Sequence, residues 1–136
     1  MIPWALPRKP MVDSVLALVT TGGVHLSSQS PFDMANPNGD PSYREIPADA
    51  SADRLMITHD YYDHREAERD PNLVFPVQRL RELVEAGILG ALHSPAYSLM
   101  GHIDGPYLHF LQEKTAPEIA RRLASARVDY ALLVPA

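Results

Sequence analysis

The sequence predicts an α/β fold of three layers, in which helices cover both faces of a short, mainly parallel sheet of the flavodoxin/Rossmann-like kind. Apolar runs of strand length alternate with segments of helical periodicity, the order that builds parallel sheets. These runs also lack the polar alternation of strands that face water on one side, which indicates burial on both faces.

The first two predicted strands flank a long polar segment. SVLALVT at residues 14–20 ends at the glycine turn Gly22–Gly23, and RLMIT at residues 54–58 forms the second strand. Residues 27–53 are rich in Ser, Pro, Asn and Asp and show no periodicity. Because such long segments in compact domains are either functional or disordered, we expect an ordered active-site loop.

A helix is predicted over residues 77–87, where apolar side chains recur at helical spacing. Pro76 fits the first helical position and Gly87 fits the end. The next apolar segment, residues 88–101, carries both helix and strand signals and has a turn at Ser94–Pro95. The sequence does not decide whether this segment forms a helix or a strand.

The last two elements are a helix and a strand. Residues 115–128 place Thr115 as an N-cap with Glu118 three residues later, the pattern of a capping box. DYALLVP at residues 129–135 is a further buried strand. Nothing in the sequence separates two domains, so we expect one domain over residues 1–136, with the last strand lacking a C-terminal continuation.

Polar and glycine-rich segments follow each predicted strand. They occupy residues 20–25, 58–64, 93–97 and 134–136. Ligands of parallel α/β sheets bind at the carboxyl ends of the strands. We therefore expect these segments to gather around a common cleft at one rim of the sheet.

Charge and composition exclude several classes of protein. A formal net charge of −5 and scattered arginines remove the electrostatic footprint of a nucleic-acid binder. No apolar run approaches the roughly 20 residues that span a bilayer, and the opening MIPWALPRKP does not read as a secretory signal. We expect a cytoplasmic protein that binds neither nucleic acid nor membrane.

The chain contains no cysteine. This absence rules out disulfides, cysteine-ligated metals and a thiol nucleophile within these 136 residues. Any chemistry of the chain must therefore use other side chains or a partner's thiol.

The glycine turn is the first candidate site. Thr20, Thr21, Gly22 and Gly23 offer hydroxyls and backbone amides that could cradle a carboxylate or phosphate. The segment lacks the spacing and the lysine of a phosphate loop, so a plain turn between strand and loop remains an equal interpretation.

The sequence HDYYDH is the second candidate site. His59, Asp60, Asp63 and His64 have the composition of an acid/base pair or of a divalent metal site with ligands His59, Asp63 and His64. The spacing resembles the T-H-x-H-x-D-H motif of metallo-β-lactamase-type hydrolases, with Tyr61 in place of one histidine. A hydrogen-bonded turn before a solvated helix is the structural alternative.

Other histidines and tyrosines are interpreted as structural. His93, His102 and His109 are scattered, and a lone histidine is more often a satisfied structural residue than a ligand. The tyrosines fit core or rim positions, although one of them could donate a hydrogen bond to a substrate carboxylate.

Six sequence blocks keep one order over about nine-tenths of the chain: LVTTGGVHLSSQSPFDM, GDPSYREIP, ITHDYYDHREAERDPNLVFPVQRLRELVEAGILG, MGHI, TAPEIARRL and VDYALLVPA. The long block from HDYYDH to VEAG is the most specific. Together the blocks resemble the B-type selenoprotein family of glycine, sarcosine, betaine and D-proline reductases.

The resemblance implies reductive cleavage of a C–N bond in a small amino acid or N-methylated amine. A selenol or thiol attacks the carbon, a pyruvoyl group on a partner reductase subunit activates the amine, and a thioredoxin-like donor returns electrons. In the family the nucleophile directly follows the strand that corresponds to ALLVPA, and this sequence ends there. We expect a partner subunit and a homo-oligomer. Three explanations of the missing nucleophile stay open: the sequence is part of a longer chain, the nucleophile lies on another chain, or a shortened relative has lost the redox step and kept the pocket.

The resemblance implies roles for the residues that follow the predicted strands. His59 and Asp60 would orient the amine or move a proton, with His25 as a second proton-transfer candidate. Thr20, Thr21, Gly22, Gly23 and Tyr61 would bind the substrate. The alternatives that the sequence leaves open are a metal-dependent hydrolase or metal-binding protein and a non-catalytic ligand-binding module.

Overall fold

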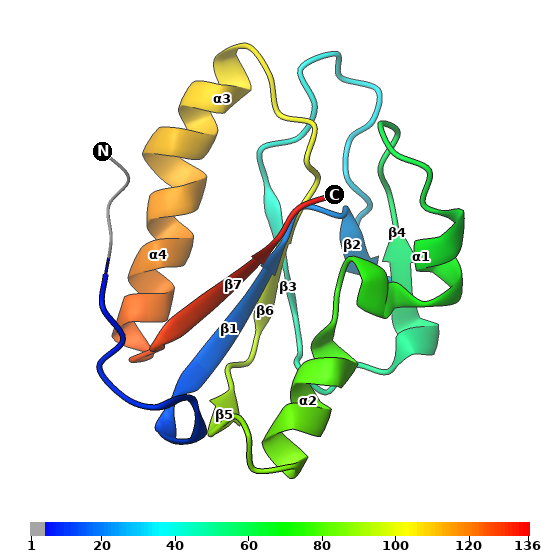
Figure 1. Ribbon diagram of the computed structural model, residues 1–136. Helices are drawn as coiled ribbons and strands as arrows, with labels where there is room; N and C mark the ends of the chain where they lie inside the picture. The colour runs from blue at the N-terminus through cyan, green and yellow to red at the C-terminus, as the bar shows by residue number, and fades with distance from the viewer. Residues whose placement is uncertain (1–4) are drawn as a thin grey trace.

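The computed structural model describes residues 5–136 and has the predicted α/β architecture (Figure 1). Its strands are β1 Val15–Thr20, β2 Val24–Leu26, β3 Tyr43–Ile46, β4 Leu55–Ile57, β5 Ala91–Leu92, β6 Ala96–Leu99 and β7 Tyr130–Val134. Its helices are α1 Arg65–Arg69, α2 Val77–Glu85, α3 Pro106–Phe110 and α4 Ala116–Ser125, with short 3-10 turns at Met11–Asp13, Ala52–Arg54 and Pro71–Leu73. None of the helices in the described part of the chain has the length and apolar character needed to cross a membrane.

The main sheet is built around β1. Strand β7 lies on one side of it, parallel, in a register that runs from Leu16 opposite Tyr130 to Thr20 opposite Val134. Strands β5 and β6 pair with β1 on the other side, also parallel, and β3 adds an antiparallel edge beyond β6. The carboxyl ends of β1, β6 and β7 therefore meet at one rim.

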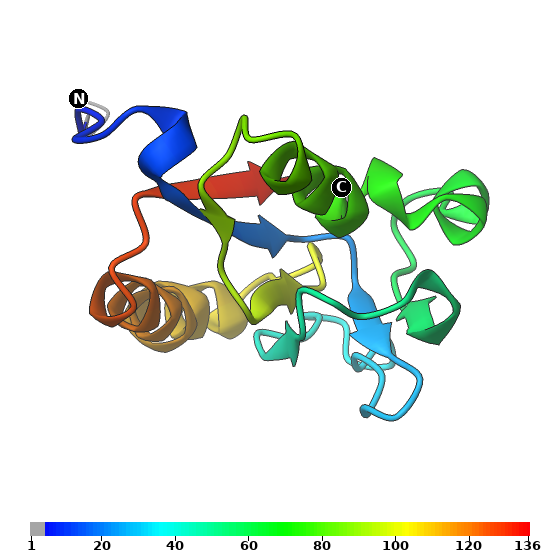
Figure 2. The same ribbon diagram turned by 90° about the horizontal axis from the view of Figure 1, so that it is seen from below.

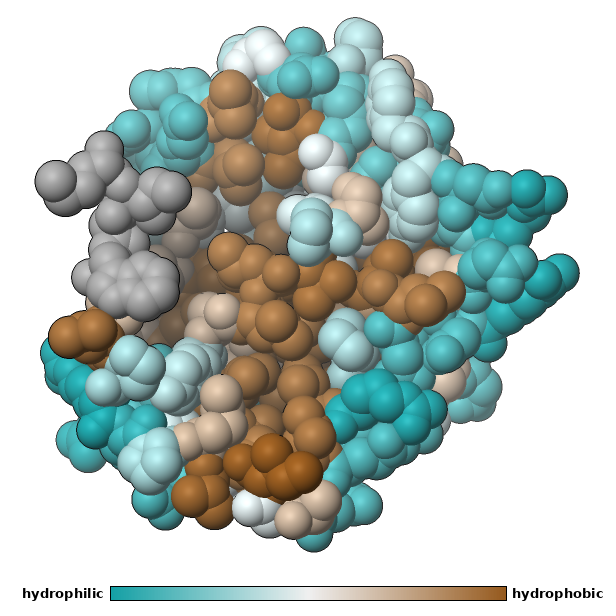
Figure 3. Space-filling model, viewed as in Figure 1, coloured by the Kyte–Doolittle hydropathy of each residue, from teal (hydrophilic) through white to brown (hydrophobic). Residues whose placement is uncertain are grey.

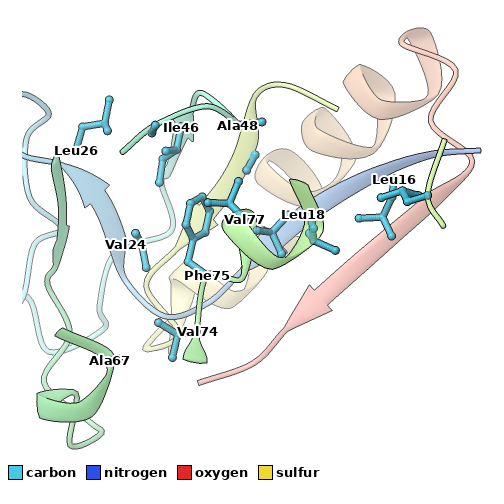
Figure 4. Close-up of a cluster of buried hydrophobic side chains, with 14 residues drawn as sticks. Leu16, Leu18, Val24, Leu26, Ile46, Ala48, Ala67, Val74, Phe75 and Val77 are labelled. Atoms are coloured by element: carbon cyan, nitrogen blue, oxygen red, sulfur yellow. The ribbon is translucent and has the colours of Figure 1, made fainter. Parts of the chain in front are cut away.

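Helices cover both faces of this sheet (Figure 2). On one face Leu18 of β1 packs in a cluster with Phe75 and Val77, at the start of α2 (Figure 4). On the other face Tyr97 of β6 packs against Ile119 of α4. The fully buried middle of β1 explains why its sequence shows no polar alternation.

The strand predicted at residues 54–58 exists as β4, but its place in the main sheet was wrongly predicted. It pairs antiparallel with β2 in a separate two-stranded sheet, where Val24 lies opposite Ile57. The turn that allows this arrangement depends on Gly23, whose φ is +69° and whose added Cβ would lie 2.3 Å from the Thr58 carbonyl oxygen. A glycine is required there because any side chain would collide with that backbone.

Residues 27–53 are ordered, as expected, but they are not free of secondary structure. Strand β3 forms within them because its residues pair antiparallel with β6, a long-range contact that local periodicity cannot reveal. Gly39 forms a bridge with Ile103, and the Asp40 amide donates to the His102 carbonyl at 3.3 Å. These contacts hold the loop that follows β6 in place.

The helix predicted from Thr115 begins earlier, and its predicted capping box is wrong. Helix α3 starts at Pro106 and continues through a π-helical turn at Leu111–Thr115 into α4. Thr115 has helical backbone angles and its hydroxyl donates to the Pro41 carbonyl instead of capping the helix. Pro117 has no backbone amide to bond the Glu113 carbonyl, and the π-helical turn lies just before it.

The remaining predicted elements are confirmed with small shifts. Helix α2 begins at Val77, so Pro76 lies one position before the first helical residue. The segment left open at residues 88–101 holds β5 and β6, separated by the turn that the Ser94–Pro95 pair indicated. The last predicted strand is β7.

Strand β7 forms an edge of the main sheet, and the side chains that it exposes most are apolar. Leu133 of this strand is 69% exposed, and Leu132 is exposed as well. Apolar surface continues over β7 between α4 and α2 (Figure 3). Contiguous apolar surface of this kind is typical of protein–protein contacts.

Truncation of the core at Phe75 should be costly. Phe75 is fully buried, so Phe75→Ala should lower the free energy of unfolding by about 3–5 kcal/mol through lost burial and a cavity. Phe110→Ala removes a half-exposed ring and should cost about 1 kcal/mol or less. Urea unfolding compares the two variants, and equal losses would contradict this description of the core.

Candidate functional site

Three strand ends meet at the rim of the main sheet. The Thr21 amide donates to the Val134 carbonyl at 3.0 Å, and the Ala136 amide donates to the Thr21 hydroxyl at 3.1 Å. A Cβ placed on Gly101, just after β6, would lie 3.1 Å from the Ala136 carbonyl oxygen and 3.2 Å from that of Thr21. The end of β7 therefore lies directly beside the segments that follow β1 and β6.

His59 reaches this rim from the two-stranded sheet. Its ring is buried, and the Gly101 amide lies 3.2 Å from Nε2 while the Tyr61 amide lies 3.1 Å from Nδ1. The edge of the Tyr62 ring packs against it at 4.8 Å between centroids. The glycine turn, the HDYYDH segment and the end of β7 thus gather at one place, as the sequence predicted. The prediction was wrong for residues 93–97, which connect β5 to β6 beside the middle of β1 and lie before the rim.

The surroundings of His59 favour its neutral form. Burial lowers the pKa of the ring, the charges of His102 and His64 lower it further, and Asp60 opposes them. Both ring nitrogens also face backbone amides, which can only donate. A neutral ring can accept from one of these amides, whereas a protonated ring would set an N–H group against both, so the surroundings keep His59 unprotonated.

A pocket of about 260 Å³ opens beside His59. It is lined by His59, Tyr61, Gly101, His102, Ile103, Asp104 and Ala136. Tyr61 is exposed, and its ring lies 4.3 Å from that of His102 in an edge-on arrangement. The lining combines aromatic rings with one carboxylate, so it offers acceptors and π-faces to a small polar molecule.

The predicted glycine cradle is held by hydrogen bonds to other parts of the protein. The Thr20 hydroxyl is buried, donates to the Val74 carbonyl at 2.6 Å and accepts from the Gly22 amide at 3.0 Å. The Gly23 amide donates to the Leu99 carbonyl, and the Gly22 carbonyl accepts from the Tyr62 hydroxyl. Substrate binding by Thr20, Gly22 and Gly23 stays a prediction, and their polar groups have partners within the protein.

The predicted proton-transfer residues separate in the structure. His25 is buried in β2, where its Nδ1 lies 2.9 Å from the Leu26 carbonyl and its Nε2 lies 2.8 Å from the Thr58 hydroxyl. It touches the residue before His59 but does not line the pocket. Asp60 is exposed next to His59 and acts on its pKa.

The ligand set His59, Asp63 and His64 does not assemble. Asp63 is held by the Arg65 guanidinium, which lowers the pKa of its carboxyl, and His64 Nδ1 lies 2.8 Å from the Glu68 carboxylate. Among residues 5–136, no three His, Cys, Asp or Glu side chains are placed to share a metal ion. The metal-dependent alternative therefore has no support from this geometry.

Comparison with known proteins decides the family. A sequence profile described as glycine/sarcosine/betaine reductase selenoprotein B matches residues 1–136. The chain belongs to this family. The resemblance predicted from the sequence blocks is thereby confirmed.

Two curated relatives illustrate the match to the selenoprotein B family. The D-proline reductase subunit gamma of Acetoanaerobium sticklandii is 38% identical over 130 residues, which cover 96% of this chain and 52% of the relative. The glycine reductase complex component B subunit gamma of Symbiobacterium thermophilum is 31% identical over 108 residues, covering 74% of this chain and 24% of the relative. The chain spans about half the length of the first and less of the second. No solved structure matches it significantly.

Three residues of this pocket were missed in the sequence. Gly101, His102 and Asp104 follow β6 directly, but the type of that segment was left open and His102 was interpreted as structural. The usable signal was positional, because a histidine and a carboxylate after a parallel strand lie at the ligand-binding edge.

Thr20→Val tests whether the glycine turn has a structural role. The variant leaves the buried Val74 carbonyl and Gly22 amide without partners, so the free energy of unfolding should fall by about 1–3 kcal/mol. Thr21→Val, at a partly exposed site, serves as the matched control and should lose about 1 kcal/mol or less. A Thr20→Val protein as stable as the wild type would show that the hydroxyl does not hold the turn.

Proposed function

We propose that this chain forms the substrate pocket of a reductase that cleaves the C–N bond of a small amino acid or N-methylated amine. The observation that supports this function best is the meeting of Thr21, His59, Gly101 and Ala136 at one rim. In the family, the nucleophile follows the strand that corresponds to β7. A residue in that position would emerge beside a neutral histidine and an open pocket.

The nucleophile of this reaction is a selenol or thiol outside the sequence, because the chain contains no cysteine. Its selenium or sulfur bonds to the substrate carbon as the C–N bond breaks, and the leaving amine takes a proton. A second thiol then attacks the selenium or sulfur, and the carbon departs with a proton. The resulting disulfide-type bond is reduced by a thioredoxin-like dithiol donor.

His59 takes up a proton in this proposal. Its lowered pKa keeps it neutral, and it accepts the proton of the nucleophile at a ring nitrogen that gives up its hydrogen bond from a backbone amide. Asp60 stabilises the imidazolium that forms, since its charge raises the pKa of His59. The His25 ring forms a hydrogen bond with the Thr58 hydroxyl and so fixes the backbone just before His59.

Partner chains complete the proposed enzyme. The names of both relatives describe them as subunits, and the apolar edge at Leu132 and Leu133 offers a surface for a reductase partner or a second copy in a homo-oligomer. The pyruvoyl group that the family implies belongs to a partner subunit. When bound, it would supply a carbonyl that activates the substrate amine, and every step proposed for this chain uses only the chain's own residues.

His59→Ala should lower turnover of the reductase reconstituted with its partner subunits by about 100-fold or more. Because neutral His59 is the active form and its pKa is lowered, wild-type kcat/KM should fall with acidity only below the ordinary histidine value of about 6.5. The acid limb should disappear in the variant. Rate measurements from about pH 5 to 8 check both effects.

His109→Ala changes an exposed histidine of α3 outside the pocket lining and serves as the control, with turnover unchanged. Full activity in His59→Ala would remove this residue from the mechanism. A complex that binds amines but never turns them over would instead indicate a non-catalytic binding module.

A further inference from the structure

Strand β7 keeps one edge of its backbone free. Among residues 5–136 it pairs only with β1, and the Thr21 amide donates to the Val134 carbonyl at 3.0 Å. Because the backbone groups of successive residues in a strand point to alternate sides, those of Ala131 and Leu133 point away from β1. Both residues are exposed. Their N–H and C=O groups are therefore available to a further strand, as at the edge of any open sheet.

The Leu133 side chain lies on the face of the sheet that α4 covers. It is opposite Val19, which packs in the α4 cluster, whereas Val134 packs in the cluster under α2. Helix α4 itself contacts β6, where Ile119 meets Tyr97. Leu133 is consequently 69% exposed, and apolar surface continues over β7 beside this helix (Figure 3). A side chain this exposed has no helix packed over it.

The order of the strands determines where a further helix would lie. The sheet runs β6, β1, β7, so the chain passes from β1 through α2 on one face to β6, and returns through α4 on the other face to β7. Connections between parallel strands are right-handed in nearly all proteins. A step from β7 to a strand on its outer side continues in the direction of the step from β6 to β7. A right-handed connection therefore puts its helix on the α4 face, over Leu133.

We propose that the free edge of β7 binds a helix followed by a parallel strand, both from the part of the reductase subunit that this sequence does not match. The helix covers Leu133 with an apolar face, and the strand pairs with the backbone of Ala131 and Leu133. The matched 130 residues are 52% of the D-proline reductase subunit gamma, so a similar number of residues lies outside the match. A helix and a strand need far fewer, since a whole βαβ unit takes about 30 residues.

A second copy of this chain fits the edge less well. Two copies related by a twofold axis would pair their β7 strands antiparallel and bring Ala131 of one beside Leu133 of the other. The α4 helix of each copy is already packed on its own β6, so Leu133 would keep its open face. A helix with its strand covers both the side chain and the backbone. This edge is separate from the lining of the pocket beside His59, so its occupant does not depend on the proposed chemistry.

Hydrogen exchange of single amides tests this docking surface. In a chimera, this chain replaces the part of the Acetoanaerobium sticklandii subunit that it matches, and NMR compares the chimera with the chain alone. The Ala131 and Leu133 amides should exchange about 100-fold more slowly or better in the chimera, because they gain partners. The Leu132 amide, which faces β1, should be protected in both proteins and reports that β7 is folded.

Leu133→Lys should reduce this protection about tenfold or more, because a charged group replaces the apolar side chain that the helix buries. The stability of the chain alone should not change. Met56→Lys alters an exposed apolar residue of the two-stranded sheet and should leave the protection intact. If the chimera leaves Leu132 unprotected, the two parts are co-expressed as separate chains and compared in the same way.

Fast exchange of Ala131 and Leu133 in both formats would overturn the proposal. Protection of these amides in the chain alone that increases with protein concentration would also overturn it, because the occupant would then be a second copy. Protection that Leu133→Lys does not alter would mean that no helix lies over this side chain. The activity of His59→Ala bears only on the proposed function, so the two proposals can fail separately.

Discussion

The parallel pairing of β1 with β7 is the constraint on which the site depends. Its register sets Thr20 opposite Val134, so the chain leaving β1 and the chain leaving β7 emerge side by side. Strand β6 pairs with the other side of β1 and delivers Gly101 to the same rim. A slip of one residue would turn each side chain of β7 to the opposite face and separate these ends. Burial on both faces of β1 holds the register in place.

The site also depends on a histidine that comes from outside the main sheet. The antiparallel β2–β4 pair carries His59 to the rim, and backbone amides of Tyr61 and Gly101 fix its ring from both sides. Those amides and burial favour the neutral ring, while Asp104 adds a carboxylate to the same lining. A neutral imidazole and a carboxylate thus line one small pocket beside the end of β7.

The sequence alone predicted the layered α/β fold and the three segments that meet at the rim, because buried strands and the amphipathic α2 have strong local patterns. It placed His59 near the end of β7 by assuming that the strand before it belongs to the main sheet, although that strand, β4, lies in the separate two-stranded sheet. It failed where long-range pairing overrides local pattern, as in β3 and in the separate β2–β4 sheet. His102 was missed for the same reason, since the strand that precedes it, β6, is defined by pairing with β1 and β3 and not by its own periodicity.

A unique thiol at the end of β7 offers the most direct test of the common pocket, because the chain has no cysteine of its own. In Ala136→Cys, alkylation by iodoacetamide at neutral pH should slow several-fold when His59 is also changed to alanine, since the neighbouring neutral imidazole accepts the thiol proton. The thiol of Ser28→Cys, at an exposed position outside the pocket lining, should react at the same rate with or without His59. Reactivity at position 136 that is indifferent to His59 would contradict the meeting of these segments.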